Sequence, residues 1–135
     1  MAEHTYDYPQ LYIDFLYYFN VEQDYYECHE VLEELWLEEG RDRFYQGLLQ
    51  IAVGLYHFQN GNIGGAVKMM KAAHDKLAEY PEPFRMGIDL QQVKRETEHY
   101  LKRLERFSEH PFSFYHFKME LADPVLQDLV KQRAD

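Results

Sequence analysis

The stretch from Phe44 to Phe58 constrains the fold most, because it is apolar around most of the circumference of a helix. Two apolar stripes run along it at helical spacing, interrupted only by a few polar residues: Gln46, Gln50 and His57. A helix that is apolar on most sides is typically the central helix of a bundle. The chain is therefore predicted to be an all-α protein built around this segment.

Helical periodicity with start and stop signals recurs along the rest of the chain. Helices are predicted over residues 9–19, 24–38, 44–58, 62–77, 88–107 and 125–133. Residues 110–121 are aromatic and roughly alternating, and no partner strand is visible, so they are predicted to be an extended arm over the bundle. The 135 residues form one domain, with five or six helices and a core of about residues 8–121.

The net charge of −10 is distributed unevenly. Residues 1–40 contain eleven acids and no Lys or Arg, whereas the remaining 95 residues are close to neutral. Nucleic acid is an unsuitable partner, since phosphate neutralisation needs clustered cations. The acidic part could instead meet a basic protein or a metal, and a second copy of the chain is the other candidate partner.

Three features indicate a cytoplasmic protein. The chain has one cysteine, which excludes an internal disulfide and favours a reducing compartment. Its first residues carry neither the basic nor the apolar part of a signal peptide. No apolar run reaches the ~18 residues of a membrane helix, so a membrane is not expected as a partner.

The predicted second helix places like charges three or four residues apart, for example Glu30 and Glu34, at about 0.2–0.5 kcal/mol for each pair. Something should offset this repulsion. Basic residues of the 88–107 helix could do so, and Arg41 and Arg43 lie nearer in sequence. The alternative is that the cluster binds a cation or a basic partner.

His29 and Glu33 are four residues apart and therefore share one helical face. H-E-V-L-E resembles the first half of the zincin pattern H-E-x-x-H, but Glu33 replaces the second histidine. Because helices two and three are joined by a short link, they should be antiparallel. Gln50 and His57 then face His29 and Glu33 across a seam.

This seam is the candidate site. His29, Glu33 and His57 are predicted as ligands of a divalent transition metal or as acid/base groups, with Gln50 as a positioning residue. A bound metal would indicate hydrolysis by an activated water. A buried polar network is the structural alternative, so the pattern decides neither for nor against an enzyme.

A different class of function is suggested by small residues around the next helical hairpin. The spacing of Gly54, Ala66, Met70 and Ala73 resembles one tetratricopeptide-type helix pair, with Pro81 three residues late. Only one copy is visible, whereas at least three are normally needed for a solenoid. The corresponding hypothesis is a non-enzymatic interaction scaffold.

The segments Y-Y-E-C-H-E-V-L-E-E-L-W, F-Y-Q-G-L-L-Q-I-A-V-G-L-Y-H and G-N-x-x-G-A resemble the uncharacterised family catalogued as domain of unknown function 309. The resemblance is strongest from Asp24 to Ala66. It implies a small all-helical prokaryotic protein, and it brings no established activity, substrate or cofactor. It adds residues with a predicted ligand-binding role beside the histidines: Glu30, Trp36, Gln46 and Gln50. Its other motif residues are Gly47, Gly61, Asn62, Gly65 and Ala66.

Overall fold

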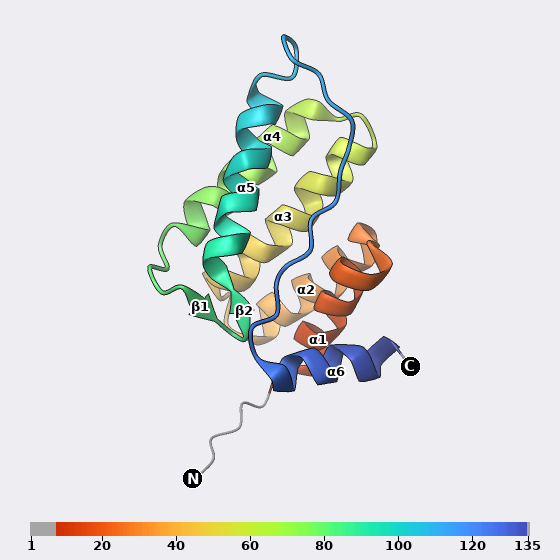
Figure 1. The fold of residues 1–135 in the computed structure, drawn as a ribbon, viewed down its shortest axis with the longest axis vertical. Coiled ribbons are helices and arrows are strands. Elements are labelled where there is room, and N and C mark those ends of the chain that lie inside the picture. Colours follow the sequence, from red (N-terminus) through yellow and green to blue (C-terminus); the bar gives the residue numbers. More distant parts are fainter. Residues whose placement is uncertain (1–7, 135) are drawn as a thin grey trace.

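The computed structural model describes residues 8–134, which form six α-helices, a short π-helix and a two-stranded hairpin (Figure 1). The α-helices are α1 (Gln10–Tyr17), α2 (Tyr25–Glu38), α3 (Arg43–Gln59), α4 (Ile63–Leu77), α5 (Leu90–Glu105) and α6 (Pro124–Ala134). The predicted all-α bundle is therefore confirmed, and the ends of the α-helices agree with the predicted ones to within two residues.

Helix α3 is the central element, as its apolar circumference predicted. It packs against α2 on one side and α4 on the other, and α4 packs in turn against α5. Glycine permits the close approach of α3 and α4: a Cβ on Gly54 would lie 3.1 Å from Cγ of Met70, and one on Gly47 would lie 3.2 Å from Leu77. Helix α6 crosses the base of the bundle beside α1 (Figure 1).

The start of α2 shows how a local signal sets a helix boundary. The Asp24 side chain accepts a hydrogen bond from the backbone N–H of Glu27, at 3.0 Å. The reciprocal half of a capping box is not formed, because the Asp24 N–H instead donates to the carbonyl of Tyr18 at 2.9 Å. Tyr18 begins the π-helix Tyr18–Glu22, which extends the predicted first helix past the end of α1. The apolar stripe of α2 is buried in full: Tyr25, Cys28, Leu32 and Leu35.

The segment before α5 contains a hairpin that the sequence did not reveal. Strands β1 (Phe84–Arg85) and β2 (Ile88–Asp89) pair antiparallel across Met86 and Gly87, both of which have positive φ. Asp89 caps α5, so this helix begins at Leu90, two residues later than predicted. Strands of two residues are too short to show the alternation by which strands are recognised.

The predicted extended arm is confirmed, and side-chain amides hold it in place. The Asn20 side chain donates to the carbonyl of Met119 and accepts from its N–H, both at 2.9 Å. The Gln92 side chain donates to the carbonyl of Lys118 at 2.7 Å and accepts from the N–H of Glu120 at 3.0 Å. The arm thus runs along the face of the bundle (Figure 1). Its backbone N–H and C=O groups are hydrogen-bonded to these side chains in the way that they would be to a neighbouring strand.

The expected pairing of the acidic α2 with basic residues is wrong for the described part of the chain. Arg43 forms its ion pair with Glu79, just past the C-terminal end of α4, at 2.6 Å. Arg41 lies over the Trp36 ring, 5.4 Å from its centroid. Helix α5 packs against α4 rather than against α2. Within residues 8–134, no Lys or Arg forms an ion pair with a glutamate of α2.

None of the helices formed by residues 8–134 is both long enough and apolar enough to cross a membrane.

Candidate functional site

A groove lies on the seam between α2 and α3, where the sequence placed its candidate site. It has a volume of about 220 Å³ and brings together two predicted residues, His29 and His57. The other residues that line it are Tyr25, Tyr26, Val53 and Tyr56. Tyr26 and Tyr56 are among the few exposed large apolar side chains, at 55% and 39% exposure, and their ring centroids are 6.4 Å apart. This seam groove is therefore mostly aromatic, with an imidazole from each helix.

The two histidines are held differently. His29 is partly exposed, and its Nδ1 lies 3.4 Å from the carboxylate of Glu30, a long contact between two solvated groups. His57 accepts at Nδ1 from the side-chain amide of Asn62, at 3.3 Å, while the Asn62 oxygen accepts from the Gly65 N–H that it caps. The amide nitrogen must then be the donor, so neutral His57 carries its proton on Nε2.

The predicted set of four polar residues does not converge. Glu33 is exposed and does not line the groove, and Gln50 is partly buried outside it. Among residues 8–134, no three His, Cys, Asp or Glu side chains are grouped to hold a metal ion. The predicted metal ligands His29, Glu33 and His57 are therefore not assembled into one site.

The remaining predicted residues lie on the same pair of helices but outside the groove. Gln46 is partly buried. The Nε1 atom of Trp36 and the Oε1 atom of Gln50 are buried and have no hydrogen-bond partner among residues 8–134. Such groups are rare in folded proteins, and a bound water or ligand atom would satisfy them.

This fold and groove describe a small helical protein with an aromatic cleft that two histidines line and that no Lys or Arg of the described residues lines. Residues 12–69 match the model of the family described as "Domain of unknown function (DUF309)". This match confirms the resemblance found in the sequence, and it covers α2, α3 and the groove.

The similar curated proteins are themselves uncharacterised. "Uncharacterized protein YpuF" of Bacillus subtilis (strain 168) is 47% identical over 66 residues, which is 47% of this chain and 38% of that protein. An "Uncharacterized protein" of Aquifex aeolicus (strain VF5) is 35% identical over 81 residues, which is 58% of this chain and 24% of that protein. The matched regions thus span less than two fifths of either relative. No solved structure matches the chain.

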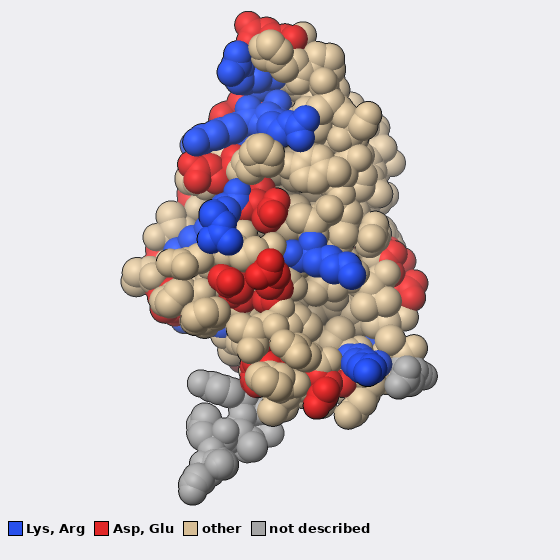
Figure 2. Space-filling view, viewed as in Figure 1, with Lys and Arg blue, Asp and Glu red and all other residues tan. Residues whose placement is uncertain are grey.

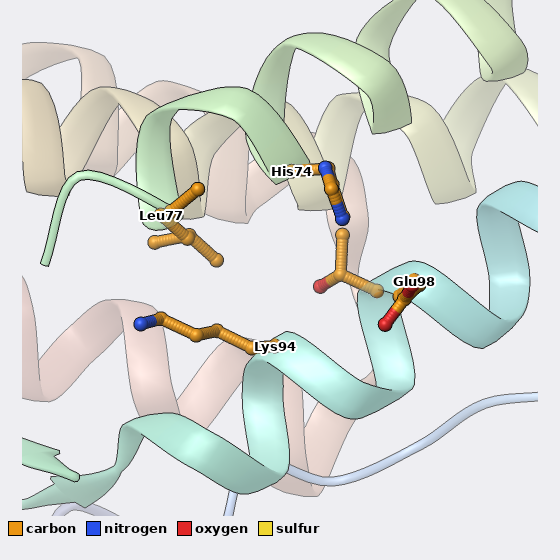
Figure 3. Close-up of a pocket in the computed structure, with 6 residues that line it drawn as sticks. His74, Leu77, Lys94 and Glu98 are labelled. Atoms are coloured by element: carbon orange, nitrogen blue, oxygen red, sulfur yellow. The ribbon is translucent and has the colours of Figure 1, made fainter. Parts of the chain in front are cut away.

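A second cavity, between α4 and α5, was missed by sequence reasoning. Its volume is about 140 Å³, and His74 from α4 and Glu98 from α5 lie at one end, with Lys94 at the other (Figure 3). Each of the three polar groups already has a partner. Lys94 donates to the carbonyl of Tyr80, Glu98 pairs with Lys102 at 3.2 Å, and His74 contacts Asp75 at 3.7 Å. The cavity is therefore lined by satisfied groups.

His116 of the arm lies beside the seam groove, in contact with one of its lining residues. The Tyr25 hydroxyl and Nδ1 of His116 form a hydrogen bond, and the His116 Nε2 is buried with no hydrogen-bond partner among residues 8–134. Burial and the nearby Lys118 lower the pKa of His116 below its ordinary value of 6.5. The folded protein therefore holds this imidazole neutral.

We expect this histidine to make the protein less stable in acid. The unfolded chain binds the proton near pH 6.5 and the folded chain does so only at lower pH, so stability is retained above 6.5 and falls as the pH drops below it. Melting temperatures of the wild type and His116→Gln from pH 7.5 to 5 should show a smaller decline for the variant. His110→Gln, at an exposed histidine, should show the same decline in melting temperature as the wild type. An equal decline in His116→Gln and the wild type would contradict the assignment.

Proposed function

We propose that the protein is an interaction module whose seam groove binds a basic segment of a partner protein. A Lys or Arg side chain of that segment would lie against the Tyr26–Tyr56 pair, with the α2 carboxylates beside it. The observation that carries the proposal is the acidic α2 face, whose glutamates form no ion pair with a Lys or Arg of residues 8–134 and which adjoins an exposed aromatic groove.

The aromatic wall supports a cationic ligand. The faces of Tyr rings attract Lys and Arg at about 0.5–2 kcal/mol, depending on desolvation. Elsewhere in this chain partly buried rings are covered by the chain's own arginines: Arg41 lies over Trp36 and Arg133 over Tyr17. The rings of Tyr26 and Tyr56 have no such cation over them in the described residues, and no Lys or Arg lines their groove.

The charge of α2 supports the same ligand. Its outer glutamates repel one another in the free protein, and a basic partner would relieve that repulsion as it binds. Glu30 contacts a residue that lines the groove, because its carboxylate lies 3.4 Å from Nδ1 of His29. The chain therefore combines an apolar contact area with long-range attraction for a cationic segment.

The hydrolytic metal site expected from the sequence is the second possibility for this groove, and it has less support. His29 and His57 both line the groove, but the third metal ligand, Glu33, does not. Two imidazoles could still act as metal-free acid/base groups. Metal dependence therefore separates this activity from peptide binding.

The test is a titration of the full chain with a blocked Arg-Leu-Arg-Lys peptide, followed by NMR at low salt and in the presence of EDTA. Amide shifts should concentrate around Tyr26, His29 and Tyr56. The double variant Tyr26→Ala, Glu30→Lys should bind at least about tenfold more weakly, because it removes both the aromatic and the charged contact.

The matched control is Glu105→Lys, which makes the same charge change on exposed α5 and should bind the peptide as the wild type does. Equal binding of a Glu-Leu-Glu-Asp peptide would sink the proposal, as would unchanged binding by the double variant. Binding that is lost in EDTA and restored by Zn²⁺ would favour the metal site instead.

A further inference from the structure

We propose that a second site, formed by the end of α5 and the start of the arm, binds a phosphate-bearing small molecule. This basic cavity has a volume of about 390 Å³ and is lined by His99, Lys102, Arg103, Arg106, His110 and Pro111. It shares no residue with the seam groove, which is lined from α2 and α3. It is therefore a separate site, and it is lined by cations whereas the seam groove is not.

The concentration of positive charge is unusual for this chain. The protein has a net charge of −10, yet three cations and two histidines line one cavity and no carboxylate does. Figure 2 shows Lys and Arg side chains gathered over the upper part of α5. The C-terminal end of a helix favours cations in its last turn. That preference accounts for cations on α5, but not for their arrangement around a cavity with histidines.

Arg103 is the residue best placed to bind an anion. Its guanidinium lies 4.1 Å from the centroid of the Phe112 ring and 5.4 Å from that of Tyr115, so two aromatic rings of the arm fix its position. It has no carboxylate partner among residues 8–134. A guanidinium stacked in this way keeps its N–H edge available for the paired oxygens of a phosphate.

The two flanking cations are only weakly engaged. Lys102 contacts Glu98 at 3.2 Å and Arg106 contacts Glu109 at 4.0 Å, and all four side chains are at least half exposed. Exposed ion pairs of this kind contribute little and are readily exchanged for a more highly charged anion. Three cations around one cavity suit a group with two or more negative charges better than a single carboxylate.

The cavity size favours a small molecule. Ligand pockets commonly measure about 300–1,000 Å³, and a volume near 390 Å³ accommodates a pyrophosphate or a sugar phosphate. A nucleic acid would need a basic surface that continues along several phosphates. Here the remaining surface of the chain is acidic or neutral overall.

The experiment is calorimetric titration of the full chain with sodium pyrophosphate at low salt, with sodium acetate as the singly charged comparison. We expect a dissociation constant on the order of 0.1–1 mM for pyrophosphate and no measurable binding of acetate. Lys102→Gln combined with Arg106→Gln should weaken binding at least about tenfold without disturbing the stacked Arg103. Arg103→Lys should also weaken it, because an ammonium cannot form the paired contact.

The matched control is Lys68→Gln combined with Lys71→Gln, which removes two exposed charges from α4 and should leave pyrophosphate binding unchanged. Thermal melts verify that all variants are folded. Absence of pyrophosphate binding, or equal binding by the Lys102/Arg106 variant, overturns the proposal. Tighter binding of a single-stranded oligonucleotide or of anionic lipid vesicles, with the same variant sensitivity, overturns the small-molecule assignment.

Discussion

Replacement of Tyr100 by alanine is expected to lower the free energy of unfolding by about 3–5 kcal/mol, the range for large aromatic truncations in a core. Tyr100 is completely buried, and its ring stacks on Tyr115 at 4.3 Å and meets Phe58 edge-on at 5.9 Å. Its hydroxyl donates to the Tyr115 carbonyl at 2.8 Å and accepts from the Tyr115 N–H at 3.2 Å. One side chain therefore joins α5 to both α3 and the arm.

Urea unfolding followed by circular dichroism measures this loss. Tyr100→Phe separates its two parts: it keeps the ring packing and should cost about 1–3 kcal/mol through the unsatisfied backbone groups of Tyr115. Tyr26→Ala is the matched control, since its side chain is 55% exposed and its loss should change stability by less than about 0.5 kcal/mol. A Tyr100→Ala loss below about 1 kcal/mol would show that the aromatic cluster is not part of the cooperative core.

The second large effect is expected from Asn20→Leu, at about 2–4 kcal/mol. Leucine fills the same buried space but leaves the N–H and the carbonyl of Met119 without partners. Gln92→Leu should act in the same way on Lys118 and Glu120. Because both variants release the same arm, their effects should not be additive.

Urea unfolding gives the stability change, and hydrogen exchange at the Met119 amide reports the arm directly. Exchange there should accelerate in Asn20→Leu more than exchange within α3. Asn60→Leu is the control, since Asn60 also bonds a backbone carbonyl, that of Tyr56 at 3.1 Å, but is exposed. If the Met119 amide stayed protected in Asn20→Leu, the amide side chain would not be what holds the arm.

The helices were predictable because their signals are local. Pro9, the Asp24 and Asn62 caps, and the glycine at position 40 mark helix ends within a few residues of where they act. The buried faces follow from a period of about 3.6 residues, which needs no knowledge of the partner helix. The positions of the helices and their buried faces are therefore the predicted parts of the fold that the structure confirms.

The parts that could not be predicted depend on contacts between distant segments. Asn20 and Met119 are 99 residues apart, and nothing in the sequence around either residue indicates the other. The ion-pair partner of Arg43 could not be predicted either, because the choice between the α2 glutamates and Glu79 depends on the packing of α4 against α3. Charge counts predict that cations and anions will pair, but not which ones.

The candidate site was predicted only in part, because its geometry also depends on contacts between distant segments. Helical spacing correctly placed His29 and His57 on facing sides of the seam. Whether Glu33 joins them depends on the direction of its side chain, and in the structure Tyr26 and Tyr56 line the groove whereas Glu33 does not. Tyr26 could have been noticed as an aromatic residue outside the apolar stripe of its helix, whereas Tyr56 belongs to one of the two apolar stripes of the 44–58 helix. Whether they were exposed could not be read from the spacing.

The amide-held arm has a consequence for how the protein avoids self-association. Residues 112–117, F-S-F-Y-H-F, are rich in aromatic residues and carry no acidic or basic residue other than histidine, the composition of segments that assemble into cross-β fibres. A free extended segment would offer its backbone edge to another chain. Asn20 and Gln92 occupy the adjoining backbone groups of residues 118–120, so the arm cannot be extended into an intermolecular sheet at that point without first breaking four hydrogen bonds. The side chains of Asn20 and Gln92 thus hold the arm on the bundle and also protect its backbone from pairing with another chain.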